Sequence, residues 1–359
     1  MIVRRKFYFI LTLAILGMLS ACNNCEVQQI DPGLAPAKDS TDRTNNFYDN
    51  ENTQELPIAA LQVSGEVANP GAVDLSSLPL HSVIVKETLL DVNGDHFVGA
   101  YRYDGYSLLD ILNHFEIEKE NAEEFAPIID LFVEIENEEG ERVVISWGEI
   151  YYPNHLHEII IASRVMRIVP SRSKDKWPLP ETSKLVVSTD LIAERNISSP
   201  SKITVRSYPR SFHTVKGLNP LYSPELKIYN DDILLEAPTQ NPTEMPVEQY
   251  NTIFYGRGRG IHSTQPFYGV MLKDILANYF ERTRTSLMQG IFLVVAADGY
   301  RAVFTYGEMM NRNDQSEVLL VCHPEVETDG IFRLFPAGDF FSDRAIKGIS
   351  AIHYYEDHE

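Results

Sequence analysis

The chain contains an internal duplication, which requires its two halves to fold into similar units. Three segments recur in the same order, and each pair keeps a glycine or an aspartate at matching positions. The pairs are 105–112 with 269–276, 140–149 with 299–308, and 190–197 with 339–346. A glutamate nine residues beyond the second pair, Glu158 or Glu317, opens an apolar run in each half. This shared order predicts two tandem copies of one domain.

The limits of the two copies follow from the repeat. The first copy covers residues 57–208 and the second covers residues 225–359. Residues 209–224 contain three prolines and one glycine, which is typical of a linker. Residues 22–56 are polar and hold few large apolar side chains, so they cannot bury enough surface to offset the entropy lost on ordering. This segment is predicted to be a flexible tether.

Residues 1–21 have the pattern of an export signal. Arg4, Arg5 and Lys6 precede an apolar run that is too short to span a bilayer as a helix. The run ends in small residues followed by Cys22, and this ending resembles a bacterial lipobox. The resemblance implies cleavage before Cys22 and a lipid anchor on that residue. An ordinary secretory signal that happens to precede a cysteine is the alternative interpretation.

The charge and cysteine content limit the partners of the chain. A formal net charge of −20 argues against binding to nucleic acid or to anionic lipid through charge. Three cysteines in 359 residues do not indicate a disulfide framework. We therefore expect a body anchored by lipid in the cell envelope, at the outer membrane. Whether it faces the periplasm or the cell surface is left open by the sequence.

The apolar pattern of each half predicts a mixed α/β domain. Apolar residues at helical spacing follow the glycine turn at 105–107, so a helix is expected to begin there. Alternating residues flank turn signals at 131–146 and 292–305, which predicts a β-hairpin in each half. Short helices after these hairpins and closing strands at 203–205 and 349–354 complete the expected elements.

Residues 63–70 resemble the opening of the oxidoreductase molybdopterin-binding domain, the fold of sulfite oxidase. Residues 103–112 resemble the strand-to-helix step of that family, and the hairpin and the late arginine–isoleucine pattern are also similar. The resemblance implies an α/β fold with mixed sheets, present here as two tandem repeats. In active members of the family a cysteine thiolate holds the molybdenum of the cofactor.

That cysteine is missing from both halves. Tyr255 stands near its place in the second copy, and Asp91 does so in the first. Neither side chain supplies a thiolate, so we expect that no molybdopterin cofactor is bound. The alternative is a molybdenum-cofactor-dependent oxidoreductase whose metal has a ligand other than cysteine.

The segment 255–262 is the strongest candidate for ligand binding. Its glycines let backbone N–H groups approach a ligand, and Arg257 and Arg259 are suited to a phosphate or a carboxylate. We expect Tyr255, Arg257, Arg259 and His262 to border a pocket for a small anion. The alternative is an exposed glycine turn whose arginines pair with surface carboxylates.

Two ion pairs are predicted from the repeat. Asp190 with Arg195, and Asp339 with Arg344, occupy matching positions in the two halves. Since both copies have these residues, we expect each pair to maintain the fold rather than to carry out chemistry.

The remaining polar residues are expected to have structural rather than chemical roles. Glu149 and Glu308 follow a glycine at expected helix starts, which is typical of capping residues. His155 and His157 have no third ligand type near them in the sequence, so we expect surface residues and no metal site. No nucleophile motif, phosphate-binding loop or triad pattern is present, and no catalytic residue is assigned.

Together these observations favour a lipid-anchored binding or assembly protein of the cell envelope over an enzyme. Its expected partners are the membrane, through Cys22, and either a small anionic ligand or another envelope protein. The competing function is the oxidoreductase described above, with molybdopterin as its cofactor.

Overall fold

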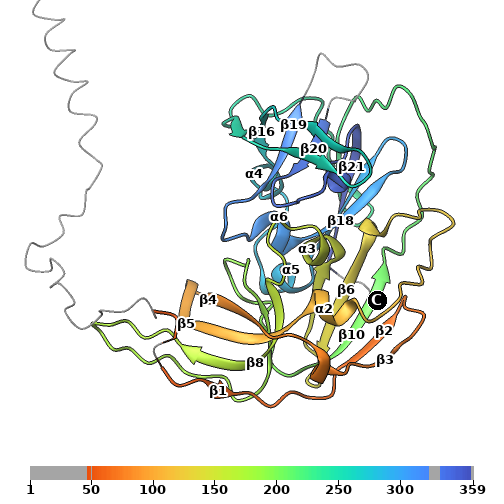
Figure 1. Ribbon diagram of the computed structural model, residues 1–359. Coiled ribbons are helices and arrows are strands. Elements are labelled where there is room, and N and C mark those ends of the chain that lie inside the picture. Colours follow the sequence, from red (N-terminus) through yellow and green to blue (C-terminus); the bar gives the residue numbers. More distant parts are fainter. Residues whose placement is uncertain (1–46, 50, 323–331, 357–359) are drawn as a thin grey trace, which may run out of the picture. The chain divides into compact units, whose positions relative to one another are not determined.

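The computed structural model describes residues 47–49, 51–322 and 332–356 (Figure 1). The predicted signal and Cys22 lie outside these residues. No helix within the described ranges has the length and apolar character needed to cross a membrane. By its contacts the chain forms one unit of residues 46–169 and 175–359, and a second of residues 1–45 and 170–174. Of the second unit, the structure describes a turn in which Lys174 donates its backbone N–H to Pro170.

Two five-stranded sheets are built from the first half of the chain. One has the order β3-β2-β10-β6-β7, in which β2 and β10 are parallel and the other neighbours antiparallel. The other has the order β1-β8-β5-β4, with β9 also paired to β8. The strands are β1 (Gln54–Glu55), β2 (Gln62–Gly65), β3 (Gly71–Ala72), β4 (His81–Asp91), β5 (Gly94–Ser107), β6 (Leu131–Asn137), β7 (Arg142–Ser146), β8 (Ile159–Arg167), β9 (Lys184–Val187) and β10 (Pro200–Ser207).

The second half contributes two larger sheets and a short hairpin. Their orders are β12-β11-β21-β17-β18 and β13-β16-β19-β20, and β14 pairs with β15 alone. The strands are β11 (Lys227–Asn230), β12 (Ile233–Glu236), β13 (Glu248–Tyr250), β14 (Phe254–Gly256), β15 (Gly260–Ser263), β16 (Phe267–Met271), β17 (Ile291–Ala296), β18 (Arg301–Thr305), β19 (Val318–Cys322), β20 (Phe332–Pro336) and β21 (Ile349–Tyr355).

The sheets of the two halves have matching orders. In each half a parallel pair, β2 with β10 or β11 with β21, continues into an antiparallel hairpin, β6–β7 or β17–β18. The chain leaves each hairpin through a one-turn helix, α3 (Trp147–Tyr151) or α6 (Tyr306–Met310). The hairpins predicted from alternating residues around Gly140 and Gly299 are confirmed, and both glycines have the positive φ that such turns favour.

The helices among the described residues are short. The α-helices are α2 (Leu108–Leu112), α3, α4 (Leu272–Leu276), α5 (Arg284–Gln289) and α6, and the 3-10 helices are η2 (Leu75–Ser77), η3 (Ile128–Asp130) and η4 (Ser342–Arg344). Each α-helix has five or six residues, which is too short to cover the face of a sheet.

The predicted α/β fold of two sulfite-oxidase-like repeats is wrong. The structure is mostly β, with 41% strand and 12% helix, and its small sheets form an arrangement like a four-bladed β-propeller ring. Helical spacing at 108–112 does predict a helix, but that helix ends after one turn. The sheets bury their apolar faces largely against one another, as in the core that joins Val63 and Ile135 of one sheet to Ile161 and Leu185 of the next.

The structure describes the end of the predicted tether and the whole of the predicted linker. The end of the predicted tether is structured, because β1 pairs with β8 and Leu56 is buried. The predicted linker 209–224 contains no strand or helix in the structure.

Candidate functional site

A cluster of buried charges lies where the two halves meet. Arg195 donates to both oxygens of Asp190 at 2.8 and 2.6 Å, and to Glu149 at 2.8 and 3.2 Å. Arg344 makes the equivalent contacts in the second half, with Asp339 at 2.8 and 2.6 Å and with Glu308. Both Asp–Arg pairs predicted from the repeat are therefore formed, and each arginine binds a second carboxylate.

The cluster crosses between the halves in a reciprocal way. Ser146, which caps α3, donates its hydroxyl to Glu308 of the second half at 2.7 Å. Thr305, which caps α6, donates to Glu149 of the first half at 2.7 Å. Each glutamate also accepts a hydrogen bond from the backbone N–H of the residue that caps its own helix. This is the capping role that the sequence predicted for Glu149 and Glu308.

Close packing keeps this cluster in place. A Cβ added to Gly148 would lie 1.9 Å from the guanidinium of Arg344, and one added to Gly307 would lie 2.3 Å from that of Arg195. Each arginine therefore lies against a glycine of the opposite half. Both guanidiniums are almost completely buried, so the cluster is closed to ligands.

The buried carboxyls respond differently to this environment. Burial raises the pKa of Asp190, Asp339 and Glu308, although the neighbouring arginines oppose the shift. Burial acts on Glu149 in the same direction, but Arg195 and the capping hydrogen bonds outweigh it and hold the pKa of Glu149 below its usual range. The four carboxyls and two arginines form one buried charge network, which joins the two halves through Ser146 and Thr305.

The predicted binding segment 255–262 forms the hairpin of β14 and β15. His262 packs over Gly256, where a Cβ would lie 2.4 Å from Nε2 of the histidine. Tyr255 packs against Phe340 and Phe341, with ring centroids 5.7 and 6.3 Å apart. Tyr255 is thus part of an aromatic cluster and does not line the pocket described next.

A cavity of about 650 Å³, which we call the cationic pocket, lies beside this hairpin. Its basic lining residues are Arg259, His262, Arg333 and Lys347, and its aromatic ones are Phe254, Phe267, Tyr268 and Tyr300. Arg259 and His262 are exposed at the hairpin, whereas Arg333 and Lys347 are half-buried. Asp298 and Asp343 are the lining carboxylates, so three permanent cations face two anions.

The two arginines of the predicted segment have different surroundings. Arg257 pairs with Asp343 at 2.7 and 2.9 Å and borders a separate cavity beside Tyr152. Arg259 lines the cationic pocket, and no ion pair of Arg259 occurs among the residues that the structure describes. The guanidinium of Arg333 lies 4.9 Å from the ring centre of Phe254 and 4.8 Å from that of Phe267. The sequence did not single out Arg333 or Lys347, because they lie far along the chain from the hairpin.

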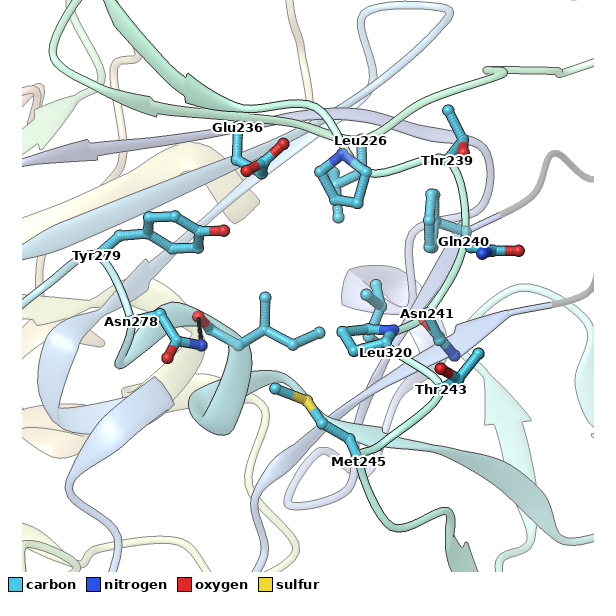
Figure 2. A pocket seen from close by; sticks show the side chains of 14 residues that line it. Leu226, Glu236, Thr239, Gln240, Asn241, Thr243, Met245, Asn278, Tyr279 and Leu320 are labelled. Carbon is cyan, nitrogen blue, oxygen red and sulfur yellow. Dashed lines mark hydrogen bonds between the residues drawn. The ribbon is translucent and has the colours of Figure 1, made fainter.

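A second cavity, of about 380 Å³, lies elsewhere in the second half (Figure 2). Residues 238–243 form one side of it, and Ile275, Tyr279 and Leu320 contribute to the rest. Glu236 is its one charged lining residue, so it lacks a group that would attract an anion. We therefore treat the cationic pocket as the better candidate for the anion site.

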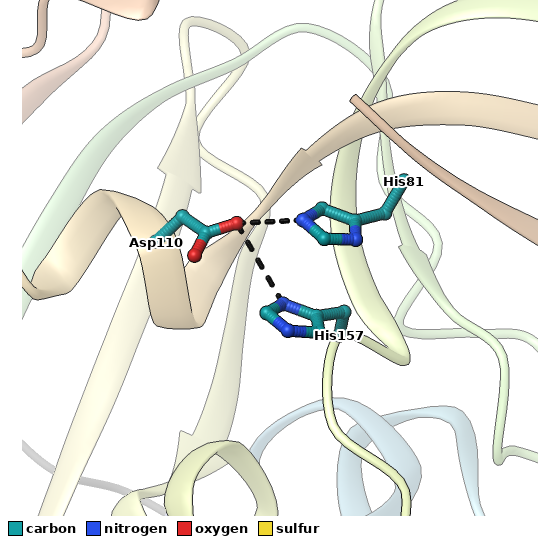
Figure 3. A group of neighbouring side chains, drawn as sticks. All are labelled: His81, Asp110 and His157. Atoms are coloured by element: carbon teal, nitrogen blue, oxygen red, sulfur yellow. Dashed lines mark hydrogen bonds and ion pairs between the residues drawn. The ribbon is translucent and has the colours of Figure 1, made fainter. Parts of the chain in front are cut away.

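Three residues of metal-binding types, two histidines and one aspartate, meet in the first half (Figure 3). His81 begins β4, Asp110 lies on α2, and His157 lies just before β8. His81 Nε2 is 2.7 Å from Asp110 Oδ2, and His157 Nδ1 is 3.6 Å from the same oxygen. The two imidazole rings are stacked, with centroids 3.9 Å apart and an interplanar angle of 5°.

The buried side chain of Ser107 contacts two members of this His–Asp–His cluster. Its hydroxyl caps α2, lies 2.9 Å from Asp110 Oδ2 and lies 3.0 Å from His157 Nδ1. Partial burial and the neighbouring His81 lower the pKa of His157, which favours a neutral ring. The expectation that His157 is merely a surface residue overlooked these contacts, because its partners are contributed by β4 and α2. His155 has the exposed position that was expected.

Comparison with known proteins does not indicate what either site binds. No protein-family model matches the chain, and no curated protein has a significantly similar sequence. The resemblance to molybdopterin-binding domains therefore rests on the residues quoted above, and the fold that it implied is not the one observed.

Proposed function

We propose that this protein is a lipid-anchored binding protein of the cell envelope. Its ligand is a small molecule that carries a carboxylate or a phosphate next to an aromatic or apolar group. The observation that carries the proposal is the cationic pocket, where Arg259, Arg333 and Lys347 share one cavity with four aromatic rings.

The chemistry of the pocket matches such a ligand. A protein with a formal net charge of −20 repels anions at long range, so cations gathered in one cavity indicate local recognition. Arg259 has the planar donors that bind carboxylate or phosphate oxygens in pairs. The guanidinium of Arg333 already lies against the rings of both Phe254 and Phe267, and the ring of Tyr268 offers further apolar surface.

The binding proposal is tested with phenyl phosphate as the probe. Calorimetry on the full-length protein in detergent is expected to show binding that Arg259→Ala weakens at least about tenfold, since a charge-assisted hydrogen bond contributes about 1.5–3 kcal/mol. Arg282→Ala is the matched control, because Arg282 pairs with Asp95 at an exposed position outside the pocket. Benzyl alcohol, which lacks the anion, is expected to bind much more weakly than phenyl phosphate.

Equal binding of phenyl phosphate to wild type and to a folded Arg259→Ala, Lys347→Ala double variant would reject the pocket as the anion site. Circular dichroism on both proteins establishes that the variant is folded.

The anchoring part of the proposal rests on the lipobox-like ending at Cys22 and on the polar segment that follows it. Cells grown with a fatty-acid analogue are expected to label the wild-type protein and not Cys22→Ser. The variant is also expected to leave the membrane fraction. Unchanged labelling and fractionation of Cys22→Ser would remove lipid anchoring from the proposal without affecting the pocket.

A further inference from the structure

We propose that His81, Asp110 and His157 form a binding site for a divalent transition metal, with Zn²⁺ as the best match. The inference goes beyond the proposed function, because this cluster lies in the first half and shares no residue with the cationic pocket. Two imidazole nitrogens and one carboxylate are a ligand set that zinc accepts, with a fourth position left for water or a substrate.

The spacing of the three groups suits a single ion. Their ligand atoms all lie within 4.8 Å of one another. Ligands bound to tetrahedral zinc at 2.0–2.1 Å lie about 3.3 Å apart. The two measured separations from Asp110 Oδ2, 2.7 Å to His81 and 3.6 Å to His157, fall on either side of that value. Small side-chain movements are therefore enough to close the three groups around an ion.

The cluster is also accessible and supported. The side chains of His81, Asp110 and His157 are 25%, 18% and 31% exposed, so an ion can reach them from solvent. His157 has φ of 68°, a conformation that costs energy for a residue other than glycine. The Ser107 hydroxyl contacts His157 Nδ1 and Asp110 Oδ2 themselves, so it fixes these two ligand atoms in the ion-free cluster and is displaced from them when an ion binds.

Binding also requires the two imidazole rings to change their relative orientation. The two rings are parallel, so the lone pairs of their nitrogens do not point at one common position. Metal binding is therefore expected to tilt one imidazole out of the stack.

The ligand types select the class of metal. Imidazole nitrogens suit zinc, copper and nickel, whereas calcium and magnesium require mainly oxygen ligands. The matching position in the second half illustrates what the site needs. There Asp274 of α4 corresponds to Asp110, but Met271 replaces the capping serine and Lys273 pairs with Glu317. A lysine so close to this position would oppose a cation.

The test is a zinc titration of the full-length protein in detergent. Cys25→Ser is used as the background for every variant, because a free thiol would compete for zinc. Zinc binding, measured by competition with a fluorescent chelator, is expected to weaken at least about tenfold in His157→Ala and in His81→Ala. His155→Ala is the matched control, because His155 is an exposed histidine two residues from His157.

Two further measurements make the result specific. Zinc is expected to raise the melting temperature of the background protein and of His155→Ala, but not that of folded Asp110→Asn. Affinity is expected to fall as the pH is lowered, because protons compete with the metal for the imidazole nitrogens. Zinc binding that is the same in His157→Ala, His81→Ala and His155→Ala would overturn the metal site. It would leave the cationic pocket untouched, since that site is tested with phenyl phosphate.

Discussion

Helices α2 and α4 follow matching strands in the two halves, yet the residues around them differ. Ser107 caps α2 and brings Asp110 together with two histidines, whereas Met271 precedes α4 and makes no capping bond. The second half in turn has the cationic pocket, which lies near the hairpin of β14 and β15.

The buried arginines, by contrast, have the same contacts in both halves. Arg195 and Arg344 each bind an aspartate and a glutamate of their own half, and each lies against a glycine of the other half. The residues that the halves share therefore build the body of the protein. The two candidate sites depend on residues in which the halves differ, namely the histidines and Ser107 in the first half and the cations near β14 and β15 in the second, and this division can be tested.

The largest expected effect comes from removing a shared arginine. Arg195→Ala or Arg344→Ala leaves two buried carboxylates without their cation, so each is expected to lower the free energy of unfolding by about 3–5 kcal/mol. Urea denaturation followed by tryptophan fluorescence measures the loss. Lys202→Ala breaks an exposed pair with Glu136 and is expected to cost less than about 1 kcal/mol. If only one of the two arginine variants loses several kcal/mol of unfolding free energy, the two arginines do not have equivalent roles in the two halves.

The next effect depends on pH and on a difference between the halves. His353 packs on Tyr229 in the second half, where the first half has Thr204 beside Ser64. Burial, with help from Arg210, lowers the pKa of His353 to about 4. The folded state therefore resists protonation of this ring, and stability is lost as the pH falls from about 6.5 towards 4.

His353→Phe is expected to lack this loss. Between pH 7.5 and pH 4, the stability of wild type relative to the variant should fall by about 2–3 kcal/mol. Urea midpoints at several pH values measure the difference. Parallel pH profiles for wild type and His353→Phe would contradict the assignment. Thr204→Val in the first half is the control, since it removes no titrating group.

The third prediction tests the contacts between the halves. Gly148→Ala and Gly307→Ala each place a methyl group against a guanidinium that carboxylates hold in position. Each is expected to cost about 1–3 kcal/mol by overpacking. Gly71→Ala is the control, because nothing lies within 4 Å of a Cβ there. If Gly148→Ala and Gly307→Ala are as stable as Gly71→Ala, the arginines can move aside and the close contact has little energetic weight.

The smallest effect concerns α2 itself. Ser107→Ala removes the cap of the helix and is expected to cost about 1 kcal/mol. The helix should still form, because α4 begins without a capping bond at the matching position. Thermal melts and circular dichroism measure both outcomes. A loss above about 3 kcal/mol would mean that Ser107 holds much more of the first half than its helix.

Local elements could be predicted from the sequence, but their packing could not. Alternation around Gly140 and Gly299 located two hairpins, and equal spacing in both copies identified the Asp–Arg pairs. The fold class was wrong because five residues at helical spacing look the same in a one-turn helix and in a long one. The spacing of apolar residues along one chain does not show whether a sheet packs against helices or against another sheet.

The candidate sites show the same limit. Arg257 and Arg259 are two residues apart at a hairpin, and the sequence could not tell which of them lines the cationic pocket. His81 and Asp110 are 29 residues apart, and their meeting depends on the turn between β4 and β5 and on the start of α2. Such convergence depends on tertiary structure, for which the sequence offers no periodic signal.

The crossed hydrogen bonds between the halves have a consequence for how the chain matures. Glu149 and Ser146 of the first half are completed by Thr305 and Glu308, which a growing chain acquires far later. At 5–20 residues per second, Arg344 follows Glu149 by roughly 10 to 40 s. Once Arg195 has been made, the first half spends the rest of that interval without the second arginine, which packs on Gly148. If synthesis ends within this stretch, the product has a first half whose surface around Ser146, Gly148 and Glu149 is left uncovered by the second half.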